Sequence, residues 1–278
     1  MLSRFYVMDV SFLEDPKTFE YWYEKMKPLR RARIDAIKPE GSRRLSLGAG
    51  ILLENALSEL GITEYGLETG DCGKPYLINK NGEPYIMKTD GISHNANTDG
   101  APHNADTEGT AVHVFFNLSH SGTKVALGIS DKEIGVDIEK VRGFKDSLIN
   151  RIFSDDEKEL AKMLSESDGQ DANPDGAYTA LWTAKESVMK YSAKGLSLMP
   201  ETIELAIDGS FPGKRNSCEK TGLGHEDKGL GDLPMKVACL KASAEEPDCS
   251  GLTLTVFAVE GYRLCVCSEY KEFDYHEE

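Results

Sequence analysis

The sequence predicts an α+β fold made of two similarly built halves, and the order of the expected elements is the main reason. A strand, then helices, then strands run through residues 1–131, and the same order runs again through residues 132–278. Helical segments have apolar residues at i, i+3 and i+4, whereas the expected strands are short apolar or alternating runs. We therefore expect one α+β unit in each half, with the boundary near residue 132.

The N-terminal half should begin with a strand at residues 4–13 and continue with helices. Residues 16–38 have a helical pattern that Pro28 should break, because proline lacks the N–H that an internal helical turn requires. The helix that follows carries an apolar stripe, with Ser42 as its expected N-cap and Gly61 as its expected stop.

A polar insertion and a hairpin complete this half. Residues 79–111 are rich in Gly, Asn, Asp and Thr and contain a near-repeat, HNANTDGAP from His94 and HNADTEGTA from His103. His and Asp could suggest metal binding, but nothing there can bury a core, so we expect a surface insertion. Beyond it, an apolar strand, a polar turn from Asn117 to Thr123 and a second strand predict a hairpin.

The C-terminal half should repeat the order of strand, helices and strands. Ser154 and Glu157 form a capping-box pattern at the start of a helix over residues 154–166. A longer helix is expected over residues 177–195, with Gly195 as its stop. The remaining expectations for this half are strands at residues 202–208 and 252–268, and a loop insertion at about 209–250.

Composition and charge exclude several classes of protein. The formal net charge of −15 argues against a nucleic-acid partner, because proteins that bind nucleic acid present basic patches. No apolar run has the length needed to span a bilayer, and the N-terminus lacks the features of a secretory signal. We therefore expect a cytoplasmic protein without a membrane partner, with its six cysteines reduced and packed.

The stretch IGVDIEKV carries two carboxylates one residue apart. Successive side chains of a strand point to opposite faces, so Asp137 and Glu139 share one face. Like charges so close repel each other, and either bulk water at a solvated strand end or a bound cation must relieve the repulsion. A site for a hard cation such as Mg²⁺ needs oxygen ligands, of which these two residues supply a pair.

The stretch WTAKESVMK adds a third carboxylate and an ammonium group. Glu186 and Lys190 are separated by four residues on one face of a helix. One interpretation is an exposed ion pair worth roughly 0.3–0.5 kcal/mol. The other makes Glu186 a third cation ligand and Lys190 a charge that binds phosphate.

Hydrogen-bond donors suited to phosphate occur in three other places. The NLSHSG turn offers the hydroxyl of Ser119 and the imidazole of His120, and GKP places Lys74 on a turn. A serine hydrolase is the alternative for the first motif, but the sequence has no G-x-S-x-G elbow and no obvious third triad member. The basic residues of the third place are Arg30, Arg31, Arg33, Arg43 and Arg44.

Taken in order, these motifs resemble those of the Sfp-type 4′-phosphopantetheinyl transferases. The matching segments are GKPYL (73–77), FNLSHSG (116–122), GVDIEKV (135–141), RIFSDDE (151–157), LWTAKESVMKYSAKGLSL (181–198) and GYRLCVC (261–267). The resemblance spans roughly residues 27–267, and the insertions at 79–111 and 209–250 interrupt none of the motifs. It implies a pseudo-dimer of two α+β halves, each a small, mainly antiparallel sheet with helices packed on it, and an active site between them.

The resemblance also implies an activity and its participants. Enzymes of this family transfer the phosphopantetheine arm of coenzyme A to a serine of an apo acyl or peptidyl carrier protein, with Mg²⁺, and release adenosine 3′,5′-bisphosphate. The substrate is then coenzyme A, the partner a carrier protein, and the chain is expected to work as a monomer. Other hypotheses stay open: a different Mg²⁺-dependent phosphoanhydride transferase or hydrolase, or a catalytically idle coenzyme A-binding protein.

Residue roles follow by position in the matching motifs. The metal ligands would be Asp137, Glu139 and Glu186, and Lys190 would contact phosphate. A carboxylate or a metal-bound water must accept the serine proton. Among the carboxylates Glu186 is the first choice and Glu157 the second, unless Glu157 serves only its capping box. The residues implied to bind coenzyme A are Lys74 and Pro75 near the adenine and phosphates, Ser119 and His120 at the phosphates, and Arg43 with Lys27, Arg30 or Arg31 at the 3′-phosphate. Carrier docking is expected near residues 144–165, with Arg142, Lys145 and Arg151.

Overall fold

The structure, a computed structural model, describes residues 2–88, 111–167, 173–207, 235–244, 249 and 251–277. The near-repeats expected from His94 and His103 lie outside these residues. The elements of the N-terminal half are β1 (Ser3–Asp9), a 3₁₀ turn (Ser11–Glu14), α1 (Pro16–Lys25), α2 (Pro28–Asp35), α3 (Glu40–Glu59), β2 (Gly66–Thr69), β3 (Pro75–Ile78), β4 (Ile86–Lys88), β5 (Ala111–His113), β6 (Phe115–Ser121) and β7 (Lys124–Ser130). Those of the C-terminal half are β8 (Ile134–Lys140), α4 (Asp146–Ile152), α5 (Asp155–Ser167), α6 (Pro174–Tyr191), 3₁₀ turns (Gly195–Ser197, Pro200–Thr202), β9 (Glu204–Ile207), β10 (Met235–Ser243), β11 (Thr253–Val259), β12 (Tyr262–Ser268) and β13 (Asp274–Glu277).

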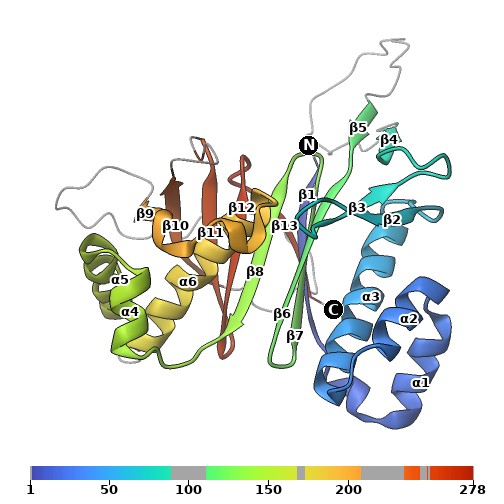
Figure 1. Cartoon of the computed structure of the whole chain (residues 1–278), viewed down its shortest axis with the longest axis horizontal. Helices are drawn as coiled ribbons and strands as arrows, with labels where there is room; N and C mark the ends of the chain where they lie inside the picture. Colours follow the sequence, from blue (N-terminus) through green and yellow to red (C-terminus); the bar gives the residue numbers. More distant parts are fainter. Residues whose placement is uncertain are drawn as a thin grey trace, which may run out of the picture.

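Two main sheets organise these elements (Figure 1). One has the strand order β13-β1-β7-β6 and the other the order β8-β12-β11-β10-β9, and every pairing within them is antiparallel except that of β1 with β13. The long helix α3 packs on the first sheet and the long helix α6 on the second. The fold is therefore α+β with mainly antiparallel sheets, as the sequence predicts.

Three apolar clusters hold these layers together. One lies between α1–α3 and the first sheet, and a second lies between α4–α6 and the second sheet. The third joins the two sheets, since Phe5 and Val7 of β1 pack with Val136 and Ile138 of β8 on the faces turned away from the helices. Gly128 of β7 permits this contact, because a Cβ there would lie 2.5 Å from a methyl group of Val136.

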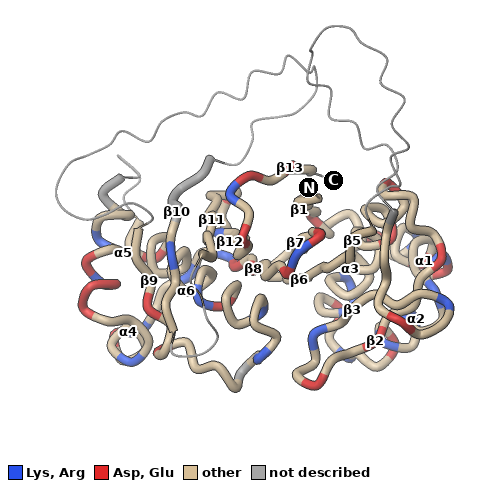
Figure 2. Tube along the Cα trace, turned by 90° about the horizontal axis from the view of Figure 1, so that it is seen from above, with Lys and Arg blue, Asp and Glu red and all other residues tan. Residues whose placement is uncertain are grey.

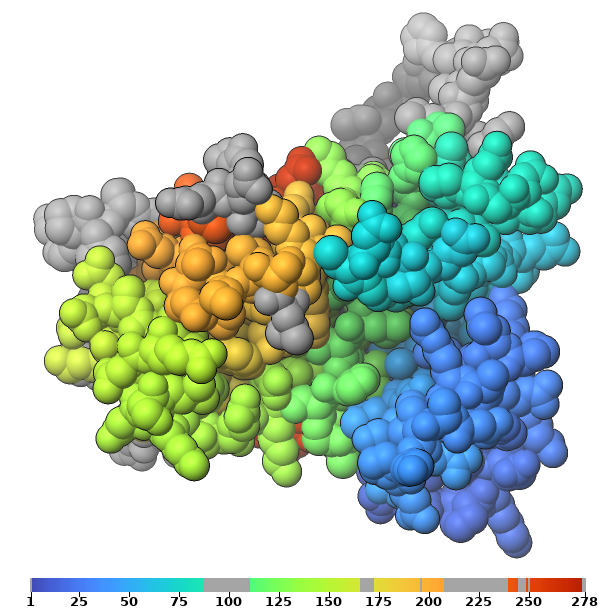
Figure 3. Space-filling model, in the orientation of Figure 1, coloured from blue at the N-terminus to red at the C-terminus, as the bar shows by residue number. Residues whose placement is uncertain are grey.

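The two halves lie side by side, and the C-terminal end of the chain returns to the first. Figure 3 shows the N-terminal residues in blue to cyan on the right and the C-terminal residues in yellow-green to orange on the left. Strand β13 pairs with β1, and His276 stacks on Tyr6 with ring centroids 4.8 Å apart. The division into residues 1–131 and 132–278 stays a prediction. No helix of the described ranges combines the length and the apolar character needed to cross a bilayer.

The helices of the first half agree with the sequence except at one cap. The break at Pro28 separates α1 from α2, and Gly61 ends α3 with a left-handed φ of 72°. The expectation that Ser42 caps α3 is wrong, because the helix begins two residues earlier at Glu40, directly after Pro39. Pro39 is extended, with φ −68° and ψ 127°, and Glu40 places a negative charge in the positive first turn of the helix.

The polar turn expected from Asn117 to Thr123 is wrong in extent. Strand β6 continues through Ser121 and pairs with β7, so the reversal is confined to Gly122 and Thr123. Gly122 has the left-handed φ of 59° that such a tight reversal requires. Asn117, Ser119 and Ser121 occupy alternate positions of this strand and meet the second sheet rather than water, whereas exposed His120 lies on the opposite face.

Three expectations for the second half also need correction. Helix α6 begins at Pro174, where the side chain of Asn173 accepts a hydrogen bond from the N–H of Asp175, and it ends at Tyr191 rather than Gly195. The strand expected over residues 252–268 is two strands, β11 and β12, with a reversal at Gly261. The expected loop at 209–250 contains β10, which pairs with β9 and β11. A register shift between Lys236 and Ala238 interrupts the alternation of β10, which weakens its signal in the sequence.

Candidate active site

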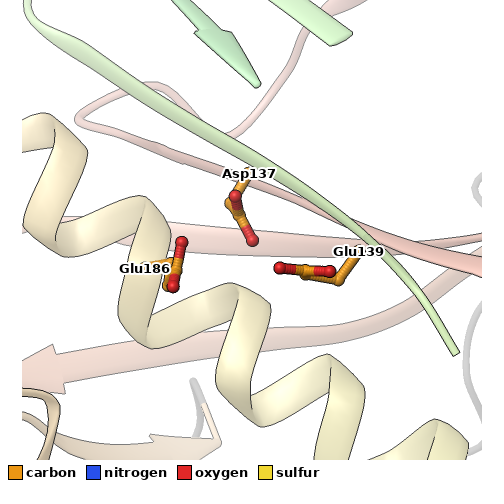
Figure 4. Close-up of side chains that lie close together, drawn as sticks. All are labelled: Asp137, Glu139 and Glu186. Atoms are coloured by element: carbon orange, nitrogen blue, oxygen red, sulfur yellow. The ribbon is translucent and has the colours of Figure 1, made fainter. Parts of the chain in front are cut away.

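Strand β8 and helix α6 bring three carboxylates together. A Cβ at Gly135 would lie 2.0 Å from the carbonyl oxygen of Ser187, so the missing side chain lets α6 lie directly on this face of β8. Asp137 and Glu139 follow on the same face, and Glu186 projects from α6 toward them (Figure 4). Oxygen atoms of the three carboxylates all lie within 4.8 Å of one another.

Lys190 is the basic group at this cluster. Its Nζ lies 2.6 Å from Asp137 Oδ1 and donates a second hydrogen bond, of 2.8 Å, to Ser119 Oγ. The ion pair that the structure shows is therefore between helix α6 and strand β8, instead of the local pair with Glu186 that an exposed helix would form. Lys190, together with Arg142, whose charge also acts on Glu186, faces three carboxyl groups, which leaves an excess of negative charge when all three are ionised.

The cluster has two features that call for a cation. Asp137 is 1% exposed, yet its Oδ2 accepts no hydrogen bond from any group of the described residues, and a buried acceptor without a donor is costly. Burial, followed by repulsion from Asp137 and Glu139, raises the pKa of Glu186 to about 7. Carboxylate oxygens are the ligands that Mg²⁺ prefers, so the residues present fit a hard divalent cation.

Ser119 and His120 do not act as a pair. They are adjacent on a strand and point to opposite faces: Ser119 is buried against Asp137, whereas His120 is exposed on the face that Phe116 and Leu118 turn toward the first core. The backbone of residues 115–121 pairs with β7, so this motif is a strand and not the turn that the sequence suggested, while phosphate binding by Ser119 and His120 stays a prediction. Only Ser119 of the two reaches the carboxylate cluster in the structure.

Lys74 joins the two halves. Its Nζ donates hydrogen bonds to Glu133 Oε2 at 2.6 Å, to the carbonyl oxygen of Ile134 at 3.1 Å and to that of Tyr191 at 3.3 Å. An ammonium group has three protons, so all of them are used. Lys74 therefore ties the start of β8 and the end of α6 to the first half, and its place near the adenine and phosphates of coenzyme A stays a prediction.

Pro75 lies beside a pocket of about 260 Å³. Aromatic and proline side chains from β3, the residues before β4, and β6 form most of its wall. They include Pro75, Pro84, Tyr85, Phe115 and Phe116. Lys74 and Glu133 lie at the same pocket, which places it where the first half meets β8.

The basic residues at the start of α2, within α2 and within α3 differ in how many partners their charged groups already have. Lys27 pairs with Glu54 at 3.6 Å, and its ammonium group stands 3.4 Å from the centroid of the Tyr65 ring. Burial, and next the charge of Arg33, lower the pKa of Arg30.

Arg31 and Arg43 retain donors for an anion. Each has a buried Nε for which the described residues supply no acceptor. One terminal nitrogen of Arg43 lies 3.7 Å from Asp35, so the guanidinium group is only partly engaged. Of the residues considered for the 3′-phosphate, these two have the most hydrogen-bonding capacity to offer.

Glu157 lies in a closed ion pair. Its Oε2 accepts from the N–H of Ser154 at 2.9 Å and from Lys185 Nζ at 2.8 Å, and its Oε1 accepts from the N–H of Leu205 at 3.0 Å. The reciprocal bond from the N–H of Glu157 to Ser154 Oγ completes the predicted capping box. Both charged side chains are at most 2% exposed, so Glu157 cannot meet a substrate, and the structure does not support it as a base.

Sequence reasoning gave Lys185 no role. Besides Glu157, the carbonyl oxygens of Ile152, Pro200 and Ile203 lie 3.0, 3.1 and 2.7 Å from its Nζ, so its three protons are shared among four acceptors. It thereby ties α4 and the segment before β9 to α6, one residue from Glu186. The available signal was its position, because a lysine on the inward face of a mostly apolar helix needs a buried partner.

The sequence is similar to known proteins in the region that contains the site. Residues 133–227 match the model of the 4′-phosphopantetheinyl transferase superfamily, a range that contains the three carboxylates and Lys190. The protein named 4′-phosphopantetheinyl transferase Sfp, from Bacillus subtilis strain 168, is 28% identical over 160 residues, which are 57% of this chain and 56% of that protein. The protein named 4′-phosphopantetheinyl transferase AcpT, from Salmonella typhimurium, is 35% identical over 156 residues, 55% of this chain and 60% of that protein.

A third relative aligns over a shorter segment. The protein named 4′-phosphopantetheinyl transferase psf-1, from Bacillus pumilus, is 38% identical over 97 residues, 34% of this chain and 39% of that protein. The alignments thus span between about two fifths and three fifths of the length of these relatives.

Proposed function

This chain belongs to the 4′-phosphopantetheinyl transferase superfamily, and from that premise we propose that it transfers 4′-phosphopantetheine from coenzyme A to a serine of an acyl or peptidyl carrier protein. The other product is adenosine 3′,5′-bisphosphate. The observation that carries the proposal is the convergence of Asp137, Glu139 and Glu186, with an unpartnered buried oxygen at Asp137. Reactions of phosphoanhydrides depend on positioning and charge neutralisation, which such a cluster can support.

The proposal assigns Asp137, Glu139 and Glu186 as ligands of Mg²⁺. When bound, the cation would neutralise charge on the pyrophosphate of coenzyme A and on the leaving group. Lys190 already stands at this cluster, where its ammonium group adds a positive charge for the same phosphates.

The remaining parts of coenzyme A would lie on the first half. Arg31 and Arg43, with unused N–H donors, suit its 3′-phosphate, and exposed His120 lies on the face of β6 turned toward that half. The pocket beside Pro75 has the aromatic and proline walls that suit a flat heterocycle such as adenine.

Glu186 is the proposed base. In the reaction, the serine oxygen forms a bond to the phosphorus next to the pantetheine arm, and the bond from that phosphorus to the bridging oxygen of the pyrophosphate breaks. The hydroxyl proton must pass to an acceptor. In the cation-free cluster the pKa of Glu186 is raised to about 7. A bound cation would lower that pKa and keep the carboxylate ionised, which is the form that can accept the proton. Glu157, enclosed by its own partners, cannot replace it.

The experiment that tests the proposal weighs carrier proteins. The protein is incubated with coenzyme A, Mg²⁺ and a panel of apo acyl and peptidyl carriers, and each intact carrier is analysed by mass spectrometry. We expect one carrier or more to gain the mass of phosphopantetheine, and the Asp137→Ala variant to lose this activity while keeping its circular dichroism spectrum. If coenzyme A binds but no carrier changes mass, the idle-binder hypothesis holds. Release of adenosine 3′,5′-bisphosphate without any carrier would favour a hydrolase.

Carrier docking is proposed near residues 144–165, which include α4 and most of α5, at the left of Figure 2. Arg142, Lys145 and Arg151 are exposed there, although the chain as a whole is acidic. Reversing these three charges should raise the KM for the carrier and leave the KM for coenzyme A unchanged. An unchanged KM for the carrier would contradict the docking proposal. We further propose that the protein acts as a monomer, since both halves of the proposed site lie in one chain, and that it works in the cytoplasm.

A further inference from the structure

Strand β6 carries three polar side chains on the face that meets β8. They come from alternate positions, Asn117, Ser119 and Ser121. Each accepts a hydrogen bond from a backbone N–H of β8: Asn117 Oδ1 from Val136 at 2.8 Å, Ser119 Oγ from Ile138 at 3.3 Å and Ser121 Oγ from Lys140 at 3.1 Å. The offset is 19 residues at every rung, so this polar ladder runs in constant register between two strands that belong to different sheets.

The ladder supplies hydrogen-bond acceptors for backbone N–H groups at the edge of the second sheet. Strand β8 is the edge strand of its sheet, and alternate N–H groups of an edge strand point away from the neighbour with which it pairs. The side chains of β6 accept from those groups without a backbone ladder between the sheets. The two halves are thereby fixed in register along β8, the strand that carries Asp137 and Glu139.

The two serines make a second contact that Asn117 does not make. Ser119 Oγ donates to Asp137 Oδ1, and Ser121 Oγ donates to Glu139 Oε2, both at 2.8 Å. At the first rung the corresponding position of β8 is Gly135, which has no side chain to receive a hydrogen bond. The ladder therefore combines one rung that only joins strands with two rungs that also hold carboxylates.

We infer that Ser121 is a positioning residue that holds the carboxylate of Glu139 in the orientation needed to bind a divalent cation together with Asp137 and Glu186. Its hydroxyl has one proton, and the bond accepted from the N–H of Lys140 leaves that proton to Glu139. Glu139 is the more exposed carboxylate of β8, so without this donor its side chain would sample other rotamers and lose entropy on binding a cation. The inference rests on the proposed function only in taking the carboxylate cluster as a cation site.

Ser121 gives a cleaner test than Ser119. Ser119 Oγ also accepts from Lys190, so its substitution changes the environment of a proposed phosphate-binding group as well as that of Asp137. The contacts of Ser121 Oγ that the structure shows are to Glu139 and to the backbone of Lys140. A change at Ser121 therefore reports on the orientation of one carboxylate.

The test measures the affinity for Mn²⁺ alone, by electron paramagnetic resonance titration without coenzyme A or carrier. Ser121→Thr keeps the hydroxyl and Ser121→Val replaces it by a methyl group of nearly the same shape, so the pair differs only in the hydrogen bonds. We expect Ser121→Val to weaken Mn²⁺ binding about tenfold, as is typical when a group that orients a metal ligand is lost, and Ser121→Thr to stay within about twofold of the unmodified protein.

Asn117→Ala is the matched control, because it removes a rung of the ladder without touching a carboxylate. Its Mn²⁺ affinity should stay within about twofold of the unmodified protein, while its melting temperature falls because the N–H of Val136 is left without an acceptor. Equal weakening by Asn117→Ala and Ser121→Val would overturn the inference, since it would show that the general register of the sheets matters and the orientation of Glu139 does not. If Ser121→Val does not fold, Ser121→Ala replaces it in the comparison.

The outcomes separate this inference from the proposed function. A folded Ser121→Val variant with unchanged Mn²⁺ affinity would overturn the inference, whatever the carrier experiment shows. An unmodified protein that binds no Mn²⁺ would overturn it too. A protein that binds Mn²⁺ in the expected order of variants but modifies no carrier would contradict the proposed transfer and support the positioning role.

Discussion

Helix α6 serves two carboxylate clusters that differ in how completely the protein satisfies them. Lys185 and Glu186 are neighbours in the chain and point to different sides of the helix. Lys185 meets Glu157 in a closed cluster, where both side chains are at most 2% exposed and the lysine donates to three backbone carbonyls as well. Glu186 meets Asp137 and Glu139 in an open cluster, where negative charge exceeds positive charge.

The difference shows how to distinguish a structural acid from a functional one. In the closed cluster, each oxygen of Glu157 has a donor, so no capacity is left for a ligand. In the open cluster, the described residues leave Asp137 Oδ2 without a donor, and the pKa of Glu186 is raised to about 7 by burial and by the neighbouring carboxylates. Both clusters contain acids and a lysine. They differ in the carboxylate oxygens without a donor and in the negative charge without a counter-charge. Only the open cluster has these, and a cation could bind to them.

The largest expected effect is on catalysis at the open cluster. Glu186→Gln keeps the shape of the side chain but removes its charge and its proton affinity, so we expect carrier modification to fall about a thousandfold or more. Glu157→Gln, the matched change in the closed cluster, should keep most of the activity of each folded molecule. Initial rates from intact-carrier mass spectrometry, corrected for the folded fraction, measure both. Equal losses in the two variants would remove the distinction between the clusters.

The next effect is on stability at the closed cluster. Lys185→Met leaves the carboxylate of Glu157 buried without its cation, which should lower the free energy of unfolding by about 3–5 kcal/mol. The double variant Glu157→Leu/Lys185→Met removes both charges and should recover a large part of the loss, because well-packed apolar residues can replace a buried ion pair. Urea denaturation measures the free energies. A double variant no more stable than the single one would show that the capping and backbone hydrogen bonds, rather than the charge pair, hold this cluster.

The sequence predicted the open cluster better than the closed one. The two-residue period of a strand places Asp137 and Glu139 on one face, and the motif order placed Glu186 with them, because local periodicity and a family pattern suffice for that step. The sequence did not reveal the acceptors of Lys185, because the carbonyl groups of Ile152, Pro200 and Ile203 come from separate segments that only the tertiary fold brings together.

The ladder of β6 was missed for a related reason. A run such as NLSHSG has the composition of a turn, and polarity alone does not separate side chains that face water from side chains that face another sheet. The two-residue spacing of Asn117, Ser119 and Ser121 was the available signal for a strand. It became informative only once the edge of β8 was known to lie opposite.

A third effect links the open cluster to pH. The carboxyl group of Glu186 has a folded-state pKa of about 7 against an ordinary value of 4.5, so the folded protein holds this proton more tightly than the unfolded chain. The free energy of unfolding should therefore fall as the pH rises from about 4.5 to about 7, by about 3 kcal/mol for this group in the absence of a divalent cation.

The difference between the unmodified protein and Glu186→Gln isolates this contribution. Without a divalent cation, the variant should be the more stable of the two at pH 8 and lose that advantage near pH 5. Millimolar Mg²⁺ should raise the melting temperature of the unmodified protein at pH 8 and raise that of the variant less. A difference that stays constant from pH 5 to pH 8 would mean that the three carboxylates are not in electrostatic conflict.

The smallest expected effect concerns Lys74, which extends the comparison to a third lysine. Its ammonium group resembles that of Lys185 in having acceptors for all three protons, although its partner Glu133 is 41% exposed. If Lys74 is a structural tie between the halves, Lys74→Met should lower the free energy of unfolding by about 1–2 kcal/mol, the scale of a partly exposed ion pair with two additional hydrogen bonds. The KM for coenzyme A should then change by less than about threefold, a bound set by the loss of one neutral hydrogen bond or less. Lys132→Met is the matched control, because Lys132 pairs with Glu269 at the surface, where both side chains are nearly half exposed, and its loss should leave the stability essentially unchanged. The opposite result, an unchanged stability with a tenfold higher KM for coenzyme A, would place the ammonium group of Lys74 on the phosphates and show that its three protein acceptors give way to the substrate.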